Sequence, residues 1–146
     1  NKKKKSTKLI NDELPNMKKI KHNSYDGVID CFTSYCLTKK DFEKYIKRIS
    51  ESIKKNGLFH CQILSKNSDL FRNYKPSTKI KNSLLSIKRK SSPFPNDNYL
   101  FSFYNKNEIK KILKKNNLKK ISIEIHSRTY RNSSEYFEYL IFDCQK

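Results

Sequence analysis

The sequence contains no tryptophan, no alanine and only two glycines among its 146 residues, which is unusual for an α/β protein. Lysine, asparagine, isoleucine, tyrosine and phenylalanine are abundant instead. All five have A/T-rich codons, so a biased genome is the simplest explanation. No apolar run approaches the roughly 18 residues of a membrane span, and no signal-peptide pattern opens the chain. The length allows one domain or part of one.

Acidic residues are few: 14 Asp and Glu stand against 33 Lys and Arg, which gives a formal net charge of +19. A chain this basic normally suggests nucleic acid or another anionic partner. However, the lysines are spread along predicted helix faces, and arginine, which binds phosphate and guanine best, is scarce. Two interpretations stay open, codon bias and a real polyanion site. The arginines are Arg48, Arg72, Arg89, Arg128 and Arg131.

The cysteines form no close metal-ligand pair. Cys31 and Cys36 have four residues between them, which is too wide for a zinc knuckle, and no Cys/His pair lies nearby. Cys61 and Cys144 fall inside predicted strands, where a thiol usually packs as a small hydrophobe. The sequence therefore predicts no metal site. Thiols of this kind without a secretion signal predict a reducing, cytoplasmic location.

The clearest helix signal lies between Thr38 and Gly57. Thr38 is a good N-cap, and Asp41 follows it at the capping-box position. Asn56-Gly57 supplies a C-terminal stop. The apolar residues between them recur at the spacing of one helix face: Phe42, Ile46, Ile49 and Ile53.

This helix connects two predicted apolar strands, residues 25–32 and 58–64. A strand, helix, strand unit of this length predicts a parallel pair with a right-handed crossover. In open α/β sheets, ligands bind outside the carboxyl ends of such strands. The sequence therefore predicts a ligand site at residues 30–37.

Residues 65–100 contain three prolines, several Ser and Asn residues and one weak apolar patch, Leu84-Leu85-Ile87. A segment this long between elements is often an insert that forms a lid or binding segment. The other interpretation is a surface excursion with one short helix. The prolines are Pro76, Pro93 and Pro95.

A second helix and a hairpin are predicted in the remaining sequence. Asn105 opens the helix with Glu108 at the capping-box offset, and Asn116-Asn117 ends it. Ile121, Ile123 and Ile125 then alternate with polar residues, which predicts a strand with one wet face. Residues 136–143 are a further strand, and the short polar stretch before them allows an antiparallel hairpin.

Three stretches carry a family resemblance. NSYDGVID (23–30) is similar to a fourth strand, and IKRISESIKKNGLFHCQIL (46–64) to a helix and fifth strand. YLFSFYNKNEIKKILKKNNLKKISIEIHSRTY (99–130), followed by EYLIFDCQK (138–146), is similar to a last helix and terminal hairpin. Together they resemble the C-terminal half of class I S-adenosylmethionine-dependent methyltransferases. The resemblance implies an α/β fold, a partial Rossmann-like sheet of parallel strands plus a C-terminal antiparallel hairpin.

Two parts of that family's cofactor site have no counterpart here. One is the glycine-rich turn after the first strand, and the other is the acidic residue that binds the ribose hydroxyls. Glycine occurs only at positions 27 and 57. Because the resemblance begins near the family's third strand, we expect an N-terminally truncated enzyme. Residues 1–8 would be a lysine-rich disordered start, and residues 9–146 the C-terminal part of a methyltransferase domain.

The resemblance implies S-adenosylmethionine as the cofactor and places its adenine near Asn11 and Asp12. It places the methyl donor beside Asp30, Cys31 and Phe32. Other interpretations stay open for the two acids. Asp12 could be a solvated turn residue, and Asp30 could cap the turn after its strand, since turns favour Asp.

The methyl acceptor would bind among Tyr35, Cys36, Tyr104, Arg128 and Tyr130. The tyrosines offer aromatic walls with polar tips, and Arg128 could hold an anionic group. The other interpretation is that these are ordinary surface residues. Related enzymes often carry His where this chain has Cys36, so no catalytic residue is assigned.

A general base, if the acceptor needs one, has three nearby candidates: Asp30, His60 and His126. His60 lies inside a predicted strand and is expected to pack in the core. His126 falls near a strand end, which is a better position.

The sequence thus predicts a methyltransferase acting on a small molecule, without a metal and without a membrane partner. The alternative is a non-enzymatic basic α/β module that binds nucleic acid. In the methyltransferase family the first strand pairs with the fourth, which corresponds to residues 25–32 here. Without that partner strand, this apolar edge is expected to cause self-association.

Overall fold

The computed structural model describes residues 7–85, 99–130 and 132–146. In these parts, no helix is both long and apolar enough to cross a membrane. Most of the predicted lysine-rich start lies outside the described residues, and so do residues 86–98 of the predicted insert. The elements follow in the order β1 (Tyr25–Cys31), the 3-10 turn η1 (Ser34–Cys36), α1 (Lys39–Ser52), β2 (Ile53–Ser65), α2 (Asp69–Arg72), β3 (Thr78–Ile80), β4 (Ser83–Leu85), β5 (Leu100–Tyr104), α3 (Lys106–Lys115), β6 (Lys119–Tyr130) and β7 (Glu135–Gln145).

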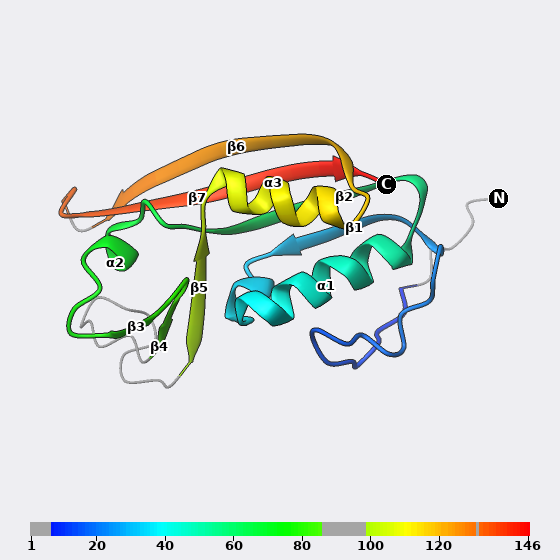
Figure 1. Cartoon of the computed structure of the whole chain (residues 1–146), viewed down its shortest axis with the longest axis horizontal. Helices are drawn as coiled ribbons and strands as arrows, with labels where there is room; N and C mark the ends of the chain where they lie inside the picture. Colours follow the sequence, from blue (N-terminus) through cyan, green and yellow to red (C-terminus); the bar gives the residue numbers. More distant parts are fainter. Residues whose placement is uncertain (1–6, 86–98, 131) are drawn as a thin grey trace.

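The strands form one mixed sheet with β2 at its centre (Figure 1). Along one edge, β2 pairs antiparallel with β7, and β7 pairs antiparallel with β6. Along the other edge, β1 runs parallel to β2 from the Gly27–Leu58 pair to the Cys31–Gln62 pair. β5 then runs parallel to the end of β2, beginning at Leu64, and β4 and β3 extend from β5. The predicted parallel pair and C-terminal hairpin are confirmed.

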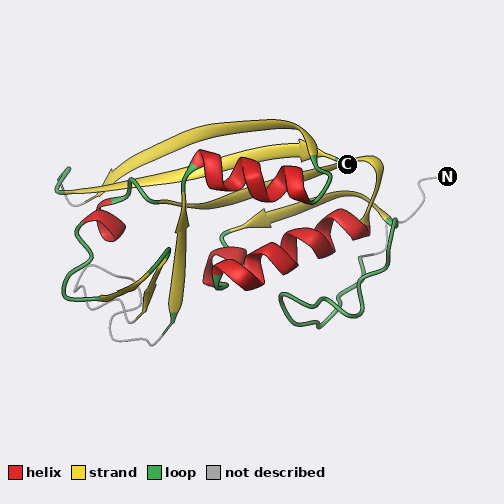
Figure 2. Ribbon diagram, in the orientation of Figure 1, coloured by secondary structure: helices red, strands yellow, loops and turns green. Residues whose placement is uncertain are grey.

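Helices α1 and α3 lie on the same face of the sheet and cover the main core (Figure 2). Phe59, Cys61 and Ile63 alternate along β2 and point toward the helices, because side chains two positions apart share a face. Phe142 of β7 meets Phe59 edge to face, with 5.7 Å between ring centroids. Ser50 Oγ of α1 donates to the carbonyl oxygen after α3 at 2.7 Å, which links the two helices.

Helix α1 ends earlier than predicted. Thr38 caps it as expected, since its side-chain oxygen accepts the Asp41 amide at 3.1 Å. The last helical residue is Ser52, however, and the predicted end at Asn56 is wrong. Ile53 is fully buried, as the helical spacing required, but its backbone is extended and begins β2. A buried isoleucine fits the last turn of a helix and the first position of a strand equally well.

Gly57 has a different role from the predicted helix stop. It lies in β2, where this strand passes close to β1. A Cβ at this position would clash with the side chain of Ile53 and come within 3.0 Å of the Asp26 carbonyl oxygen. Glycine is therefore required here because two segments pack closely. The reason is not a left-handed backbone, since Gly57 has no positive φ.

Helix α3 and the antiparallel pairing of the hairpin were predicted correctly, but β6 continues to Tyr130, so the prediction that His126 falls near a strand end is wrong. Asn105 and Glu108 form the capping box, in which each side chain accepts the other residue's amide at 2.9 Å. Residues 109, 112 and 113 are buried as predicted. Strand β5 was not predicted, because its five residues are too few to show a period before the helix cap begins.

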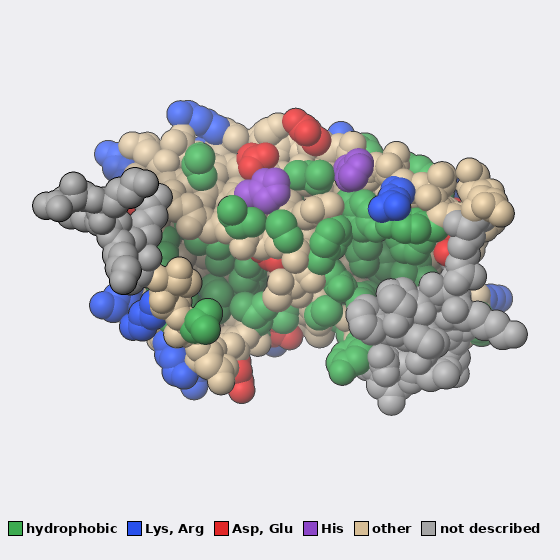
Figure 3. Space-filling model, turned by 180° about the vertical axis from the view of Figure 1, so that it is seen from behind, with side chains coloured by type: hydrophobic (Ala, Val, Ile, Leu, Met, Phe, Trp, Pro, Cys, Tyr) green, Lys and Arg blue, Asp and Glu red, His purple; other side chains and the backbone are tan. Residues whose placement is uncertain are grey.

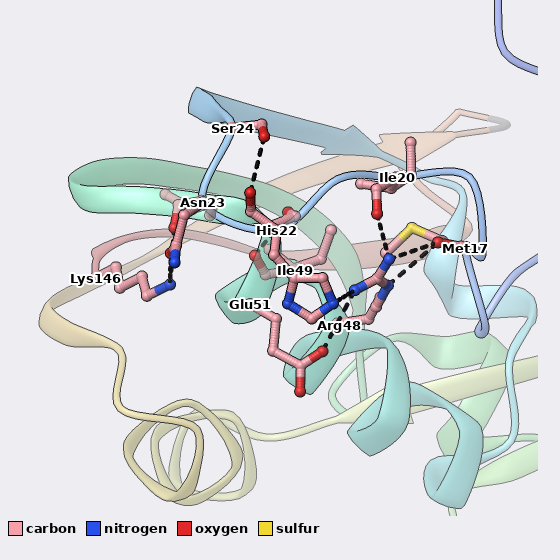
Figure 4. Close-up of polar contacts among 11 residues, drawn as sticks. Met17, Ile20, His22, Asn23, Ser24, Arg48, Ile49, Glu51 and Lys146 are labelled. Carbon is pink, nitrogen blue, oxygen red and sulfur yellow. Dashed lines mark hydrogen bonds and ion pairs between the residues drawn. The ribbon is translucent and has the colours of Figure 1, made fainter.

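Arg48 of α1 binds the segment before β1 at several points (Figure 4), in addition to the backbone bonds from Asn23 and Ser24 to the end of α1. The Arg48 guanidinium donates to the carbonyl oxygen of Met17 at 3.2 and 3.1 Å, and also to that of Ile20. Its Nη1 lies 2.6 Å from His22 Nε2 and 3.5 Å from Glu51 Oε2. Because guanidinium only donates, His22 must accept this hydrogen bond. A single side chain therefore ties several points of this segment to the helix.

Candidate functional site

The candidate site begins at a tight turn after β1. Phe32 has a φ of 57°, and its amide donates to the Gln62 carbonyl oxygen at 3.2 Å. Asp30 Oδ1 accepts the amides of Thr33 at 3.1 Å and Ser34 at 3.4 Å. Asp30 therefore caps the turn, as the second interpretation of this residue predicted. Its contact with a methyl donor stays a prediction.

Asp30 belongs to the side of the sheet that α1 covers. It is 3% exposed, and its Oδ2 lies 3.6 Å from Cys61 Sγ. Burial first, and the nearby Asp30 second, raises the pKa of the Tyr45 hydroxyl and of the Cys61 thiol. Both groups therefore stay protonated beside the carboxylate. The arrangement fixes the turn and leaves Asp30 engaged with internal donors.

Aromatic side chains gather on the other face of the sheet, at the carboxyl ends of β1 and β2. Strand alternation places Phe137 and Tyr139 there, because Leu140 and Phe142, at the even-numbered positions of β7, point toward the helices. Leu64 and Phe103 are buried beneath them in a second apolar cluster. We call this group the aromatic surface; its members are Phe32, Tyr35, Phe101, Tyr130, Phe137 and Tyr139.

The rings form a continuous series. Tyr35 stacks on Phe101, with 5.2 Å between centroids and 16° between planes. Phe32 meets Tyr35 and Tyr139 edge to face, at 6.1 and 5.1 Å. Phe137 lies beside Tyr139 at 6.5 Å. All these separations fall within the range of about 4.5–7 Å in which aromatic pairs attract each other.

Strand β6 adds polar side chains to this surface. The hairpin register places Arg128 opposite Phe137, and His126 opposite Tyr139. The Arg128 guanidinium carbon lies 4.8 Å from the centroid of Tyr130, and the His126 ring lies 6.4 Å from that of Tyr139. Figure 3, which views the molecule from behind, shows hydrophobic side chains gathered beside histidine and basic side chains.

The polar tips of the aromatic surface are hydrogen-bond donors at neutral pH. Burial, followed by the hydrogen bond with Tyr130, raises the pKa of Tyr139 to about 12. Burial, followed by the effect of Cys36, raises the pKa of Tyr35. Burial also raises the pKa of the Cys36 thiol. These groups therefore remain protonated, and Cys36 lacks the thiolate that a nucleophile needs.

The structure brings most predicted acceptor residues together but not Tyr104. Tyr104 is fully buried in the main core, where its ring lies 4.8 Å from that of Phe42 in α1. Alternation along β5 points Phe101 to the aromatic surface and Tyr104 to the helices. The prediction that Tyr104 forms a wall of the acceptor site is therefore wrong. The residues that do lie on the aromatic surface or in the turn beside it are Tyr35, Cys36, Arg128 and Tyr130.

Asn11 and Asp12, predicted near the adenine, lie in the segment before β1. Asp12 Oδ1 accepts the Glu13 amide at 2.9 Å, and its Oδ2 accepts the Lys19 amide at 2.6 Å. These bonds match the interpretation of Asp12 as a turn residue. Both residues line an open pocket of about 310 Å³ with Lys19. Their contact with adenine stays a prediction.

His60 does not pack in the core, and that prediction is wrong. Its neighbours Phe59 and Cys61 point toward the helices, so His60 points to the opposite face. Its Nδ1 lies 2.9 Å from Asp143 Oδ1, and 37% of the side chain is exposed. His126 lies on this face too, next to Tyr139.

Phe101, Phe137 and Tyr139 were missed by sequence reasoning. A signal for the last two was present: they alternate with residues that belong to the core, and the hairpin register places them opposite Arg128 and His126. Pairing the two predicted strands residue by residue would have found them. Phe101 gave no such signal, because β5 itself was not predicted.

Neither a protein-family model nor a curated protein matches the sequence. Solved structures match the fold. A methyltransferase from Methanosarcina mazei superposes with a TM-score of 0.63 at 17% identity, over 86% of this chain and 60% of that one. A possible histamine N-methyltransferase from Thermotoga maritima gives 0.58 at 19% identity, over 92% and 60%. The 1,6-didemethyltoxoflavin N1-methyltransferase of Burkholderia thailandensis gives 0.53 at 13% identity, over 86% and 45%.

This chain therefore spans 60% of the length of the first two structures and 45% of the third. The Burkholderia enzyme holds S-adenosylhomocysteine, and a phosphoethanolamine N-methyltransferase from Haemonchus contortus, with a TM-score of 0.54, holds S-adenosylmethionine. S-adenosylmethionine is thus the cofactor that these enzymes share. Over the matched residues, the chain has the fold of class I S-adenosylmethionine-dependent methyltransferases.

Proposed function

We propose that this chain forms the acceptor-binding part of an S-adenosylmethionine-dependent methyltransferase that acts on a small molecule. The observation that carries the proposal is the aromatic surface at the carboxyl ends of β1 and β2, where α/β sheets bind ligands. Two of the similar structures are enzymes for 1,6-didemethyltoxoflavin and phosphoethanolamine, which supports an acceptor of this size.

The aromatic surface suits the needs of methyl transfer. The reaction requires alignment of donor and acceptor and exclusion of water more than it requires covalent help from the protein. The rings of Phe32, Tyr35 and Tyr139 would cover one side of an acceptor, and the two tyrosine hydroxyls would donate hydrogen bonds to it. His126, beside Tyr139, is our candidate to receive a proton from the acceptor.

The chain alone does not supply a complete cofactor site. Gly27 lies in β1 and Gly57 in β2, so neither forms a glycine-rich turn before a helix. S-adenosylmethionine would supply the methyl group, and the side chains described above would bind and orient the acceptor.

The 146-residue chain is expected to bind S-adenosylmethionine no better than millimolar. A few hydrogen bonds, each contributing roughly 0.5–1.5 kcal/mol, are all that the predicted adenine and methionine contacts could provide. Micromolar affinity needs about 8 kcal/mol. Isothermal titration calorimetry would show no saturable heat below the millimolar range. A micromolar dissociation constant would mean that this chain builds its cofactor site in another way.

The proposed activity is tested with the gene product that contains this sequence, methyl-labelled S-adenosylmethionine and two acceptor pools, metabolites and nucleic acids. Label is expected in a small molecule. Label only in nucleic acid would overturn the small-molecule acceptor. No label, together with DNA binding that weakens steeply as salt rises, would favour the non-enzymatic basic module instead.

A further inference from the structure

We propose that the aromatic surface binds a flat aromatic molecule that carries a carboxylate. The ring would lie against Phe32 and Tyr139, and the carboxylate would bind Arg128. That this ligand is then methylated rests on the proposed function. Its binding depends only on the residues of the aromatic surface and Arg128, so binding can be tested separately.

The first argument is that two of the aromatic rings are partly open to solvent. Phe32 is 39% exposed and Tyr130 is 38% exposed, although both contact other rings of the surface. Soluble proteins rarely leave a continuous apolar patch open unless something binds there. A flat ring can stack on these side chains or meet them edge to face, as they already do with one another.

The second argument is the position of the positive charge. Arg128 lies opposite Phe137 and covers the Tyr130 ring at 4.8 Å. Its planar guanidinium can form two parallel hydrogen bonds with a carboxylate. Glu124 is four positions earlier on β6, about 13 Å along the strand. Glu135 faces Tyr130, so it is a diagonal neighbour of Arg128 as Tyr139 is, but on the opposite side, nearer the hairpin turn.

The third argument separates an anionic ligand from a cationic one. Aromatic rings also attract amines, so the rings alone do not decide the sign of the charge. A tyrosine hydroxyl can donate to an anion or accept from a cation, so Tyr35 and Tyr139 suit either charge. Arg128 and the net charge of +19 repel a cation and attract an anion.

The hairpin register also limits the size of the ligand. Arg128 pairs with Phe137, and Tyr139 is two residues further along β7. Such diagonal neighbours lie roughly 7–8 Å apart. An aromatic ring with its carboxylate one or two bonds away would span this distance, whereas a long-chain acid would extend past the surface.

Four probes that share most of their shape test the proposal by titration calorimetry with the 146-residue chain and without cofactor. They are indole-3-acetate, its neutral amide indole-3-acetamide, the cation tryptamine and the non-aromatic acid cyclohexylacetate. Indole-3-acetate is expected to bind most tightly, at least tenfold better than the amide or cyclohexylacetate. Tryptamine is expected to show no saturable binding. If tryptamine bound as tightly as indole-3-acetate, or if all four probes had equal affinities, the proposal would be overturned.

Variants identify the residues responsible. Arg128→Gln should reduce indole-3-acetate affinity to that of the amide and leave the amide unchanged. Phe32→Leu keeps an apolar side chain in the turn, and it should lower the affinity for indole-3-acetate and for the amide alike. Lys47→Gln removes one positive charge from the exposed side of α1 and should change neither. Unchanged acid binding in Arg128→Gln, with the fold verified by circular dichroism, would refute the role of Arg128.

The two proposals can fail separately. If indole-3-acetate binds as expected but the gene product transfers no methyl group to any small molecule, the proposed function fails and the aromatic-acid site stands. If methyl transfer occurs only to acceptors that are non-aromatic or cationic, the aromatic-acid site fails and the proposed function stands.

Discussion

The 146-residue chain is expected to associate with itself in solution, and Ile29→Lys is expected to return it to a monomer. Among residues 7–85, 99–130 and 132–146, β1 pairs only with β2, so its outer edge has no partner strand. Ile29 on this strand is 76% exposed. An apolar edge strand pairs readily with another chain, and a lysine on such a strand opposes that pairing.

Sedimentation velocity over a range of protein concentrations measures this effect. Leu9→Lys is the matched control, because Leu9 is 93% exposed and lies outside every strand. It adds the same charge and removes a similar apolar side chain, so it should leave the association unchanged. A monodisperse wild-type monomer with one cooperative thermal transition would contradict the prediction.

Arg48→Met is expected to lower the free energy of unfolding by about 2–4 kcal/mol, because hydrogen bonds from a charged donor contribute about 1.5–3 kcal/mol each. The variant loses the bonds to the Met17 and Ile20 carbonyl oxygens and the contact with His22. Methionine keeps much of the apolar stem, so the loss reports the guanidinium more than its packing.

Urea unfolding gives the stability change, and limited trypsin digestion shows whether the segment before β1 opens first. We expect faster cleavage at Lys18, Lys19 and Lys21 in the variant. Lys44→Met is the control, because its ion pair with Asp41 on the same helix is largely exposed and contributes little. Equal unfolding midpoints for Arg48→Met and wild type would show that the segment is held by other contacts.

The features predicted well from the sequence are those that depend on neighbours along the chain. The caps at Thr38 and Asn105 involve residues three positions away, and both formed as expected. The hairpin joins β6 and β7, which are consecutive in the sequence. Such elements carry their own signals in helical spacing, alternation and turn residues.

The errors concern features that depend on distant segments. Ile53 satisfies the helical spacing, but its backbone follows β1, with which it pairs through Tyr25. Tyr104 was predicted to line the acceptor site. The pairing of β5 with β2 instead points its side chain into the core. The aromatic surface likewise joins a turn after β1, part of β5 and the hairpin, so no single stretch of sequence contains it.

The pairing of β2 with both β7 and β5 bears on how this protein can vary during evolution. Phe59 pairs with Cys144, 85 positions later, and the interval between them contains the segment from Ser65 to Tyr104, which forms β3, β4 and β5 of the same sheet. Those two residues pair with each other, so the ends of the segment are already neighbours. Doubling the length of a flexible loop adds only about 0.6 kcal/mol of closure entropy. Lengthening the connection before β3 is therefore inexpensive, whereas exchanging β4 or β5 would remove Leu84 and Phe103 from the core and Phe101 from the aromatic surface.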